Sequence, residues 1–240
     1  MPITVAKVDQ DDTELIKKIF RLRYQVYCLE CGFLKAEDYP DGIETDEYDA
    51  QSIHFAAIND DNEVVGAARL VLEGSLPFPL EKYCPDVAPE KLNINRSQCA
   101  EISRLVISKE LRRRKFDDLY YEPQTEDNIF RGPNENPRQG KREKPMAFDI
   151  YRTIYAESVN RGIKYWYTLM EKSLYLLLRI HGFQFDSVGE EVDCYGKVKP
   201  YLADIPKIEI KVRNTFPEIF KYFTAKLNED QRKAILARKE

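Results

Sequence analysis

The sequence predicts an α/β fold, a three-layer α/β/α sandwich with a mixed central sheet and further helices at the C-terminus. Three observations predict it. Segments with helical and strand-like spacing alternate along the chain, two strand-like runs flank a four-residue turn, and apolar residues make up 43% of 240 residues. This length fits one domain, which we assign to residues 1–240.

The elements are expected in the order helix, hairpin, strand, helix, strand, helix, strand. A helix requires apolar residues three or four apart, and a half-buried strand requires alternation. By these patterns the expected helices are 13–29, 148–159 and 171–180, and the expected strands are 53–58, 64–71, 100–107 and 163–170. A turn at 181–183 is expected to lead into a further strand, and 201–205 is the candidate for a final strand. Asn59-Asp60-Asp61-Asn62 supplies the hairpin turn.

Two segments do not fit the sandwich pattern. Residues 121–145 combine four prolines with many charges and few aliphatic side chains, which predicts a polar surface insertion. Residues 214–240 have helical spacing and are expected to form appended C-terminal helices.

Composition excludes several classes of protein. A pI near 5.5 and a net charge of −4 argue against nucleic-acid binding. No apolar run approaches a bilayer span and the N-terminus lacks a signal-peptide pattern, so we expect a cytoplasmic protein without stable membrane insertion. Five scattered cysteines, with one CxxC at Cys28 and Cys31, suit core residues better than a disulfide framework or a metal site.

Charge is unevenly distributed along the chain. The first 63 residues hold fifteen acidic and six basic residues, whereas Arg112, Arg113, Arg114 and Lys115 form a basic run. Such a run suits the docking of an acidic protein or a phosphate-bearing ligand. A solvated turn after a strand is an equally good interpretation of the charge alone.

Charged residues also stand within apolar strands. Arg69, Glu101 and Arg104 lie in predicted strands, and an acidic loop presents carboxylates in the spacing E-x-D-x-x-D from Glu44. A buried charge is costly unless it is paired, so we expect Arg69 and Arg104 to pair with Asp46, Asp49 or Glu101. Glu101 is the candidate general base, because a desolvated carboxylate beside a cleft has a raised pKa and can remove a proton from an ammonium group.

Four motifs together resemble the signature of the autoinducer (acyl-homoserine-lactone) synthases, which belong to the GNAT superfamily. The motifs are Arg23-x-x-x-Tyr27 with Phe33, Glu44-x-Asp46-x-x-Asp49, Gly66-x-x-Arg69-Leu70 and Glu101-x-Ser103-Arg104. The resemblance implies a GNAT-like fold, a thioester donor on acyl-carrier protein, a small-molecule amine acceptor, and neither a metal nor a permanently bound cofactor. By the same resemblance the catalytic residues are Glu101, Arg104 and Glu44, and the substrate-binding residues are Arg23, Tyr27, Phe33, Asp46, Asp49, Arg69 and Ser103.

Departures from the family's motifs narrow the expected acyl donor and the expected branch of the family. Residues 106–114 lack the glycine-rich turn with which GNAT acetyltransferases grip coenzyme A, so acyl-carrier protein is the preferred donor. Phe33 stands where the autoinducer synthases usually have tryptophan, and the chain is longer than the common members of that family. It therefore looks more like the acyltransferases of PEP-CTERM/exosortase systems and the N-acyl amino acid synthases.

Several alternatives stay open at this stage. The acceptor is an amino acid such as tyrosine or, for a homoserine-lactone synthase, S-adenosylmethionine. A third hypothesis is a GNAT domain that binds carrier protein or lipid without catalysis. Phe148 and Trp166 are candidates for an acyl tunnel, although their spacing is more typical of ordinary core residues.

Overall fold

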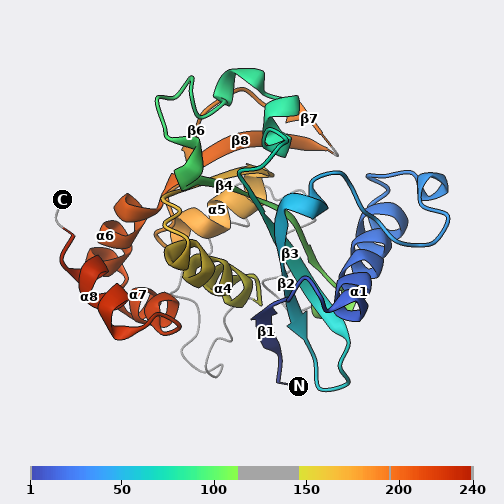
Figure 1. Cartoon of the computed structure of the whole chain (residues 1–240), viewed down its shortest axis with the longest axis horizontal. Helices are drawn as coiled ribbons and strands as arrows, with labels where there is room; N and C mark the ends of the chain where they lie inside the picture. Colours follow the sequence, from blue (N-terminus) through green and yellow to red (C-terminus); the bar gives the residue numbers. More distant parts are fainter. Residues whose placement is uncertain (1, 113–145, 195, 239–240) are drawn as a thin grey trace, which may run out of the picture.

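A computed structural model describes residues 2–112, 146–194 and 196–238, and within them the chain forms a mixed sheet flanked by helices (Figure 1). The sheet order is β1-β2-β3-β4-β5-β8-β6, and β7 pairs with β8. All the neighbouring strands in this sheet are antiparallel except β4 and β5, which are parallel. The described residues thus confirm the α/β class and the mixed sheet.

The strands and helices have the following bounds. The strands are β1 Thr4–Lys7, β2 Ser52–Ile58, β3 Val64–Leu72, β4 Cys99–Ile107, β5 Tyr165–Met170, β6 Asp186–Ser187, β7 Val192–Asp193 and β8 Lys197–Asp204. The α-helices are α1 Thr13–Tyr24, α2 Lys109–Arg112, α4 Met146–Asn160, α5 Lys172–Ile180, α6 Ile205–Thr215, α7 Pro217–Thr224 and α8 Glu229–Leu236. A π-helix, η1 Gln25–Glu30, prolongs α1, and the 3-10 helices are η2 Ala36–Asp38, η3 Asp49–Gln51, η4 Pro79–Lys82, η5 Pro85–Val87 and η6 Arg96–Gln98.

Helix α1 covers one face of the sheet. It begins where the Asp12 side chain accepts a hydrogen bond from Leu15 N at 3.0 Å. Its buried side chains, such as Ile19, pack against Ala56 and Ala67 of the hairpin. Because successive strand residues point to opposite faces, the neighbouring Ala57 and Ala68 belong to the core on the other side.

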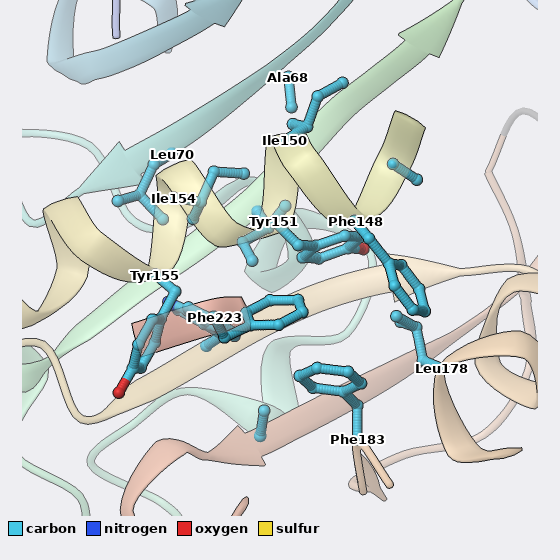
Figure 2. Packing of buried hydrophobic residues seen from close by; sticks show 14 of the residues in the cluster. Ala68, Leu70, Phe148, Ile150, Tyr151, Ile154, Tyr155, Leu178, Phe183 and Phe223 are labelled. Carbon is cyan, nitrogen blue, oxygen red and sulfur yellow. The ribbon is translucent and has the colours of Figure 1, made fainter. Parts of the chain in front are cut away.

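Helices α4 and α5 cover that second face, and Figure 2 shows the packing. Ile150 and Ile154 of α4 are fully buried against the sheet, and Leu178 of α5 lies in the same cluster. Phe148 contacts Phe183 and Phe223 edge-on, with ring centroids 5.9 and 6.2 Å apart. These aromatic rings make one continuous core between α4, the sheet and the C-terminal helices.

The C-terminal helices belong to this core as well. Buried Phe223, Leu227 and Ile235 join the cluster around α4, and Tyr155 Oη donates a hydrogen bond to Glu209 Oε1 of α6 at 2.7 Å. In Figure 1 these helices lie at the opposite side of the view from α1. They therefore complete the layer that α4 begins.

Two parts of the prediction differ from the structure. Strand β1 was not expected, because only four residues form it and Val5 alone is buried. The last long strand begins at Lys197 rather than 201, and helix α6 follows it directly. The Asp204 carboxylate accepts a hydrogen bond from Lys207 N at 3.1 Å, so an N-cap followed by Pro206 was the signal for α6 that the expected strand at 201–205 obscured.

The feature that positions the functional site is the short pairing between β4 and β5. Their parallel register covers Cys99 to Glu101 on β4 and ends at Glu101 opposite Tyr167. Beyond this point β4 continues to Ile107 and β5 to Met170, but the two strands no longer pair with each other. The two strands therefore part inside the sheet and leave room between them.

Gly182 provides a test of the helix endings. Gly182 follows α5 at φ +88°, and a Cβ there would lie 2.6 Å from the Phe216 ring. We expect Gly182→Ala to lower the free energy of unfolding by about 3 kcal/mol, from left-handed strain together with the steric clash.

The matched control is Gly162→Ala after α4, where φ is +71° and nothing lies within 4 Å of the added Cβ. It is expected to cost only about 1 kcal/mol of strain. Urea unfolding of both variants measures the difference, and equal losses of stability would contradict the expected clash with the Phe216 ring.

Candidate functional site

A cavity of about 370 Å³ lies where β4 and β5 part. We call it the central cavity. Its lining includes Glu101 to Leu105 of β4, Thr168 to Met170 of β5, and Thr45 to Tyr48 of the acidic loop. A second cavity, of about 30 Å³, is apolar and lies beside the C-terminal helices.

Glu101 stands at the point where the paired part of β4 ends. Its side chain lines the central cavity although the residue is only 2% exposed. Oε2 accepts a hydrogen bond from Leu80 N at 2.9 Å. Burial raises the pKa of this carboxyl to about 8, against the opposing effects of the Leu80 N–H and of Arg69 and Arg104.

The acidic loop is fixed to α1 by a buried arginine. Arg23 is 1% exposed; its Nε donates to Glu44, and its Nη1 donates to Asp49 Oδ1 at 2.7 Å. The arginine stands one helical turn after Ile19, on the face of α1 turned to the sheet. Its bidentate geometry holds two carboxylates of the loop at once.

Two strand arginines continue this network. Arg69 donates to both oxygens of Asp46 and, through Nη1, to Asp49 Oδ1 at 2.7 Å, while its Nε donates to Ser103 Oγ at 2.9 Å. Arg104 donates to Glu44 Oε1 at 3.1 Å and to Asp46 Oδ2 at 3.0 Å. Three arginines and three carboxylates thus tie the loop to the helix and the sheet. The pairing of Arg69 and Arg104 with Asp46 and Asp49 was among those expected from the buried charges, whereas the part played by Arg23 and Glu44 was not.

The network determines the charge states around the loop. Although burial opposes ionisation, Arg23 and Arg69 lower the pKa of Asp49 to about 2. The stabilising effect of this carboxylate is present above its ordinary pKa and is lost as the pH falls through 2. Beside it, burial lowers the pKa of His54 to about 4, so that the imidazole is neutral at pH 7.

A β-bulge interrupts β4 where this strand lines the cavity. Arg69 pairs with Ser103 and Ala67 with Val106, so two residues of β4 stand opposite one of β3. Arg104, the first residue of the bulge, has φ +52°, an uncommon value for a residue with a side chain. Tyr27 Oη donates to the carbonyl of Leu105 at 3.3 Å, and the Arg104 guanidinium lies 5.6 Å from the Tyr27 ring. The strained backbone is held by the same residues that line the site.

The structure brings the ten predicted catalytic and substrate-binding residues into one region but divides them between two layers. The residues that line the central cavity are Tyr27, Phe33, Asp46, Glu101, Ser103 and Arg104. The residues that lie behind this lining are Arg23, Glu44, Asp49 and Arg69. Glu44 has no exposed surface, because its carboxylate is enclosed between Arg23 and Arg104.

The predicted carrier-protein docking residues fall largely outside the described part of the chain. Arg112 is the last residue of α2, while Arg113, Arg114, Lys115 and the polar insertion at 121–145 lie outside the described residues. The docking surface therefore stays a prediction from the sequence.

Some lining residues had no signal in the sequence. Pro79, Lys82 and Tyr83 come from the irregular segment between β3 and β4, which lacks any periodic pattern. Tyr151 has helical spacing on α4, which does not distinguish core from cavity.

Phe148 and Trp166 are core residues, as the favoured interpretation of their spacing predicted. Both are buried in the large cluster, and Trp166 Nε1 donates to Ser158 Oγ at 2.9 Å. Neither lines the central cavity.

Comparison with known proteins is consistent with this geometry. Residues 22–122 match the family described as an acetyltransferase (GNAT) domain. The structure resembles BjaI, a CoA-dependent acyl-homoserine lactone synthase solved with SAM and isopentyl-CoA, with a TM-score of 0.62, 16% identity, and coverage of 93% of this chain and 89% of that one. It also resembles TofI in a ternary complex with an inhibitor and MTA (TM-score 0.60, 17% identity, coverage 91% and 100%).

A third similar structure comes from a different functional group. FeeM, an N-acyl amino acid synthase from uncultured soil microbes, matches with a TM-score of 0.54 and 11% identity over 88% of this chain and 94% of that one. These identities are low, and the three structures show a shared fold.

The matched segment and the shared fold relate the chain to known proteins. Residues 22–122 match a GNAT acetyltransferase domain. The chain shares its fold with a CoA-dependent acyl-homoserine lactone synthase and with an N-acyl amino acid synthase. In the described part of the chain, no helix has the length and apolarity to cross a membrane, and no cluster of side chains is arranged to hold a metal ion.

The buried network predicts a large effect of removing one arginine. Arg23→Met keeps most of the side-chain volume but removes one of the two arginines that pair with Glu44, in a site that has no exposure. We expect the free energy of unfolding to fall by about 3–5 kcal/mol, the range for breaking a buried ion pair from one side.

Arg21→Met, on the exposed face of the same helix, serves as the control and should change stability by less than about 0.5 kcal/mol. Chemical denaturation of both variants at pH 7 decides the matter. A small loss for Arg23→Met would mean that the loop is held by other contacts.

Proposed function

We propose that this enzyme transfers a fatty acyl group from a thioester on acyl-carrier protein to the amine of an amino acid or a related small molecule, with Glu101 as the general base. The observation that carries the proposal is the position of Glu101. It is a buried carboxyl on the wall of the central cavity, at the point where β4 and β5 part, and its pKa is raised to about 8.

The chemistry needs such a group. An ammonium ion cannot attack a thioester, so the acceptor must lose a proton before or during attack on the carbonyl carbon. In its ionised form the Glu101 carboxylate accepts that proton, the amide bond forms, and the carbon–sulfur bond breaks to release the thiol. A pKa near the working pH suits a base that must both take up and return the proton.

The lining of the cavity offers two unlike kinds of surface for the two substrates. Asp46 of the acidic loop and Ser103 and Arg104 of β4 provide charged and hydroxyl groups. Met170 of β5 and Leu174 of α5 provide apolar surface. We assign the polar surface to the amine acceptor and the apolar surface to the acyl chain.

The donor proposal rests on the basic run that begins at Arg112 and on the absence of a glycine-rich turn after β4. Coenzyme A is the alternative carrier of the same thioester, and BjaI, similar in fold, is named as CoA-dependent. Rate measurements with one acyl group presented on either carrier separate the two. Faster turnover of the coenzyme A thioester would overturn the carrier-protein proposal but leave the acyltransferase intact.

An acyl-homoserine-lactone synthase that uses S-adenosylmethionine is the second candidate. The match to BjaI, solved with SAM, favours it, whereas the match to FeeM favours the amino-acid acceptor. Mass spectrometry of lipids from a host that expresses the chain distinguishes them. An N-acyl amino acid supports the proposal, an acyl lactone supports the second candidate, and no new amide with retained carrier binding indicates a non-catalytic domain.

Glu101→Gln tests the base directly. The amide fits the same space but cannot accept a proton, so we expect kcat to fall about a hundredfold or more with the fold preserved. Steady-state assays with the acceptor found above measure the change. Glu171→Gln is the matched control, since Glu171 also lines the cavity and burial also raises its pKa; wild-type turnover in Glu101→Gln would remove Glu101 from the mechanism.

The pH dependence follows from the raised pKa. Below pH 8 only a minority of Glu101 is ionised, so the rate should rise about tenfold per pH unit and level off above about pH 8. The acceptor amine titrates as well, so the part assigned to Glu101 is the part that Glu101→Gln lacks. A pH–rate profile of the same shape in both proteins would contradict the assignment.

A further inference from the structure

A cluster of charged residues outside the cavity is coupled to Glu101 through the backbone. Arg96 donates to Glu81 through Nη1 at 2.7 Å and Nη2 at 2.8 Å, and to Glu90 through Nε at 2.6 Å and Nη2 at 2.8 Å. We call these three residues the Arg96 clamp. Every guanidinium nitrogen of Arg96 is used, which makes it a fixed connection between η6 and η4.

The clamp acts on the turn that carries the hydrogen bond to Glu101. Glu81 Oε1, held by Arg96, accepts a hydrogen bond from Phe78 N at 2.8 Å and so closes the turn of η4. The Arg96 guanidinium also lies 5.3 Å from the centre of the buried Phe78 ring. Between these two fixed residues stands Leu80, fully buried, whose N–H donates to Glu101 Oε2.

We propose that Arg96 is a positioning residue for acyl transfer, which holds η4 so that the Leu80 N–H orients the Glu101 carboxylate toward the central cavity. This inference rests on the proposed role of Glu101. It goes beyond that role because Arg96 lies outside the cavity lining and acts only through η4.

These contacts determine the direction in which loss of Arg96 shifts the ionisation of Glu101. The Leu80 N–H stabilises the ionised carboxylate, and the charge of Glu81 opposes ionisation. Loss of Arg96 releases the turn that holds the Leu80 N–H and leaves the Glu81 carboxylate without its counter-charge. Both changes favour the protonated form of Glu101. The other charged and titratable groups that act on or near Glu101 are Arg69, Arg104, Tyr48, Cys84 and Cys194, and the substitution leaves all of them in place.

The test is the pH–rate profile of Arg96→Met with the donor and acceptor that the wild type turns over. We expect the Glu101-dependent rise of the rate to occur about one pH unit higher than in the wild type. Such a shift corresponds to the free energy of about one hydrogen bond to a charged group, and it lowers kcat about tenfold at pH 7. The rate should recover at high pH, and KM for the acceptor should change little. Arg96→Lys keeps the charge but loses the fork, and should shift the profile by less.

A second readout does not depend on turnover. Infrared titration of the protonated carboxyl band, as the difference from Glu101→Gln, follows the ionisation of Glu101 in wild type and in the Arg96 variants. Lys91→Met is the matched control, because Lys91 pairs with Asp86 at 2.7 Å on the same segment, both of them exposed, and has no contact with η4 in the described hydrogen bonds.

The possible outcomes test the positioning role of Arg96 separately from the proposed role of Glu101. An upward shift in Arg96→Met and a smaller one in Arg96→Lys, with none in Lys91→Met, supports the positioning role. A uniform loss of rate without a shift, or no change in folded protein, overturns it. Should Arg96→Met fail to fold, the Arg96→Lys titration decides alone. A Glu101→Gln variant with wild-type activity refutes the proposed base itself and is recognised independently of Arg96.

Discussion

The site depends on the attachment of the acidic loop to the sheet through buried arginines. Each carboxylate of the loop would be costly to bury alone, and each arginine in an apolar strand or on a buried helix face would be costly as well. Together Arg23, Arg69 and Arg104 satisfy Glu44, Asp46 and Asp49 in one connected network. Because the loop has little regular structure, this network is what makes it a wall of the central cavity.

The second constraint is the parting of β4 and β5. A fully paired sheet would have no opening between these strands, and the buried carboxyl of Glu101 would face only packed side chains. Pairing that stops at Glu101 places this residue at the start of the gap, and the bulge at Arg104 lies in the part of β4 that lines it. The exposure of the Glu101 carboxyl to the cavity and the cavity itself thus both follow from the irregularity of the sheet at β4.

The sequence revealed the part of the site built on strands and on the acidic loop better than the part that comes from the irregular segment between β3 and β4. Arg69 and Arg104 were recognisable because a charge in an apolar strand requires a partner, and the spacing of the acidic loop supplied the partners. Tyr83 and Lys82 were not, since the segment between β3 and β4 has no periodicity and folds through local turns and the Arg96 clamp. Helix α6 was missed for a related reason, because its start depends on a cap at Asp204 that lies within an apolar, strand-like run.

The environment of Glu101 also has a consequence for the fold as a whole. In the unfolded chain this carboxyl ionises near its ordinary pKa of 4.5, whereas in the folded protein it does so near 8. Its contribution to stability is therefore present below about pH 4.5 and is lost progressively as the pH rises to 8. At neutral pH the native state accordingly carries a residue that would be better accommodated as an uncharged side chain, and this ionisable carboxyl is retained at the expense of conformational stability.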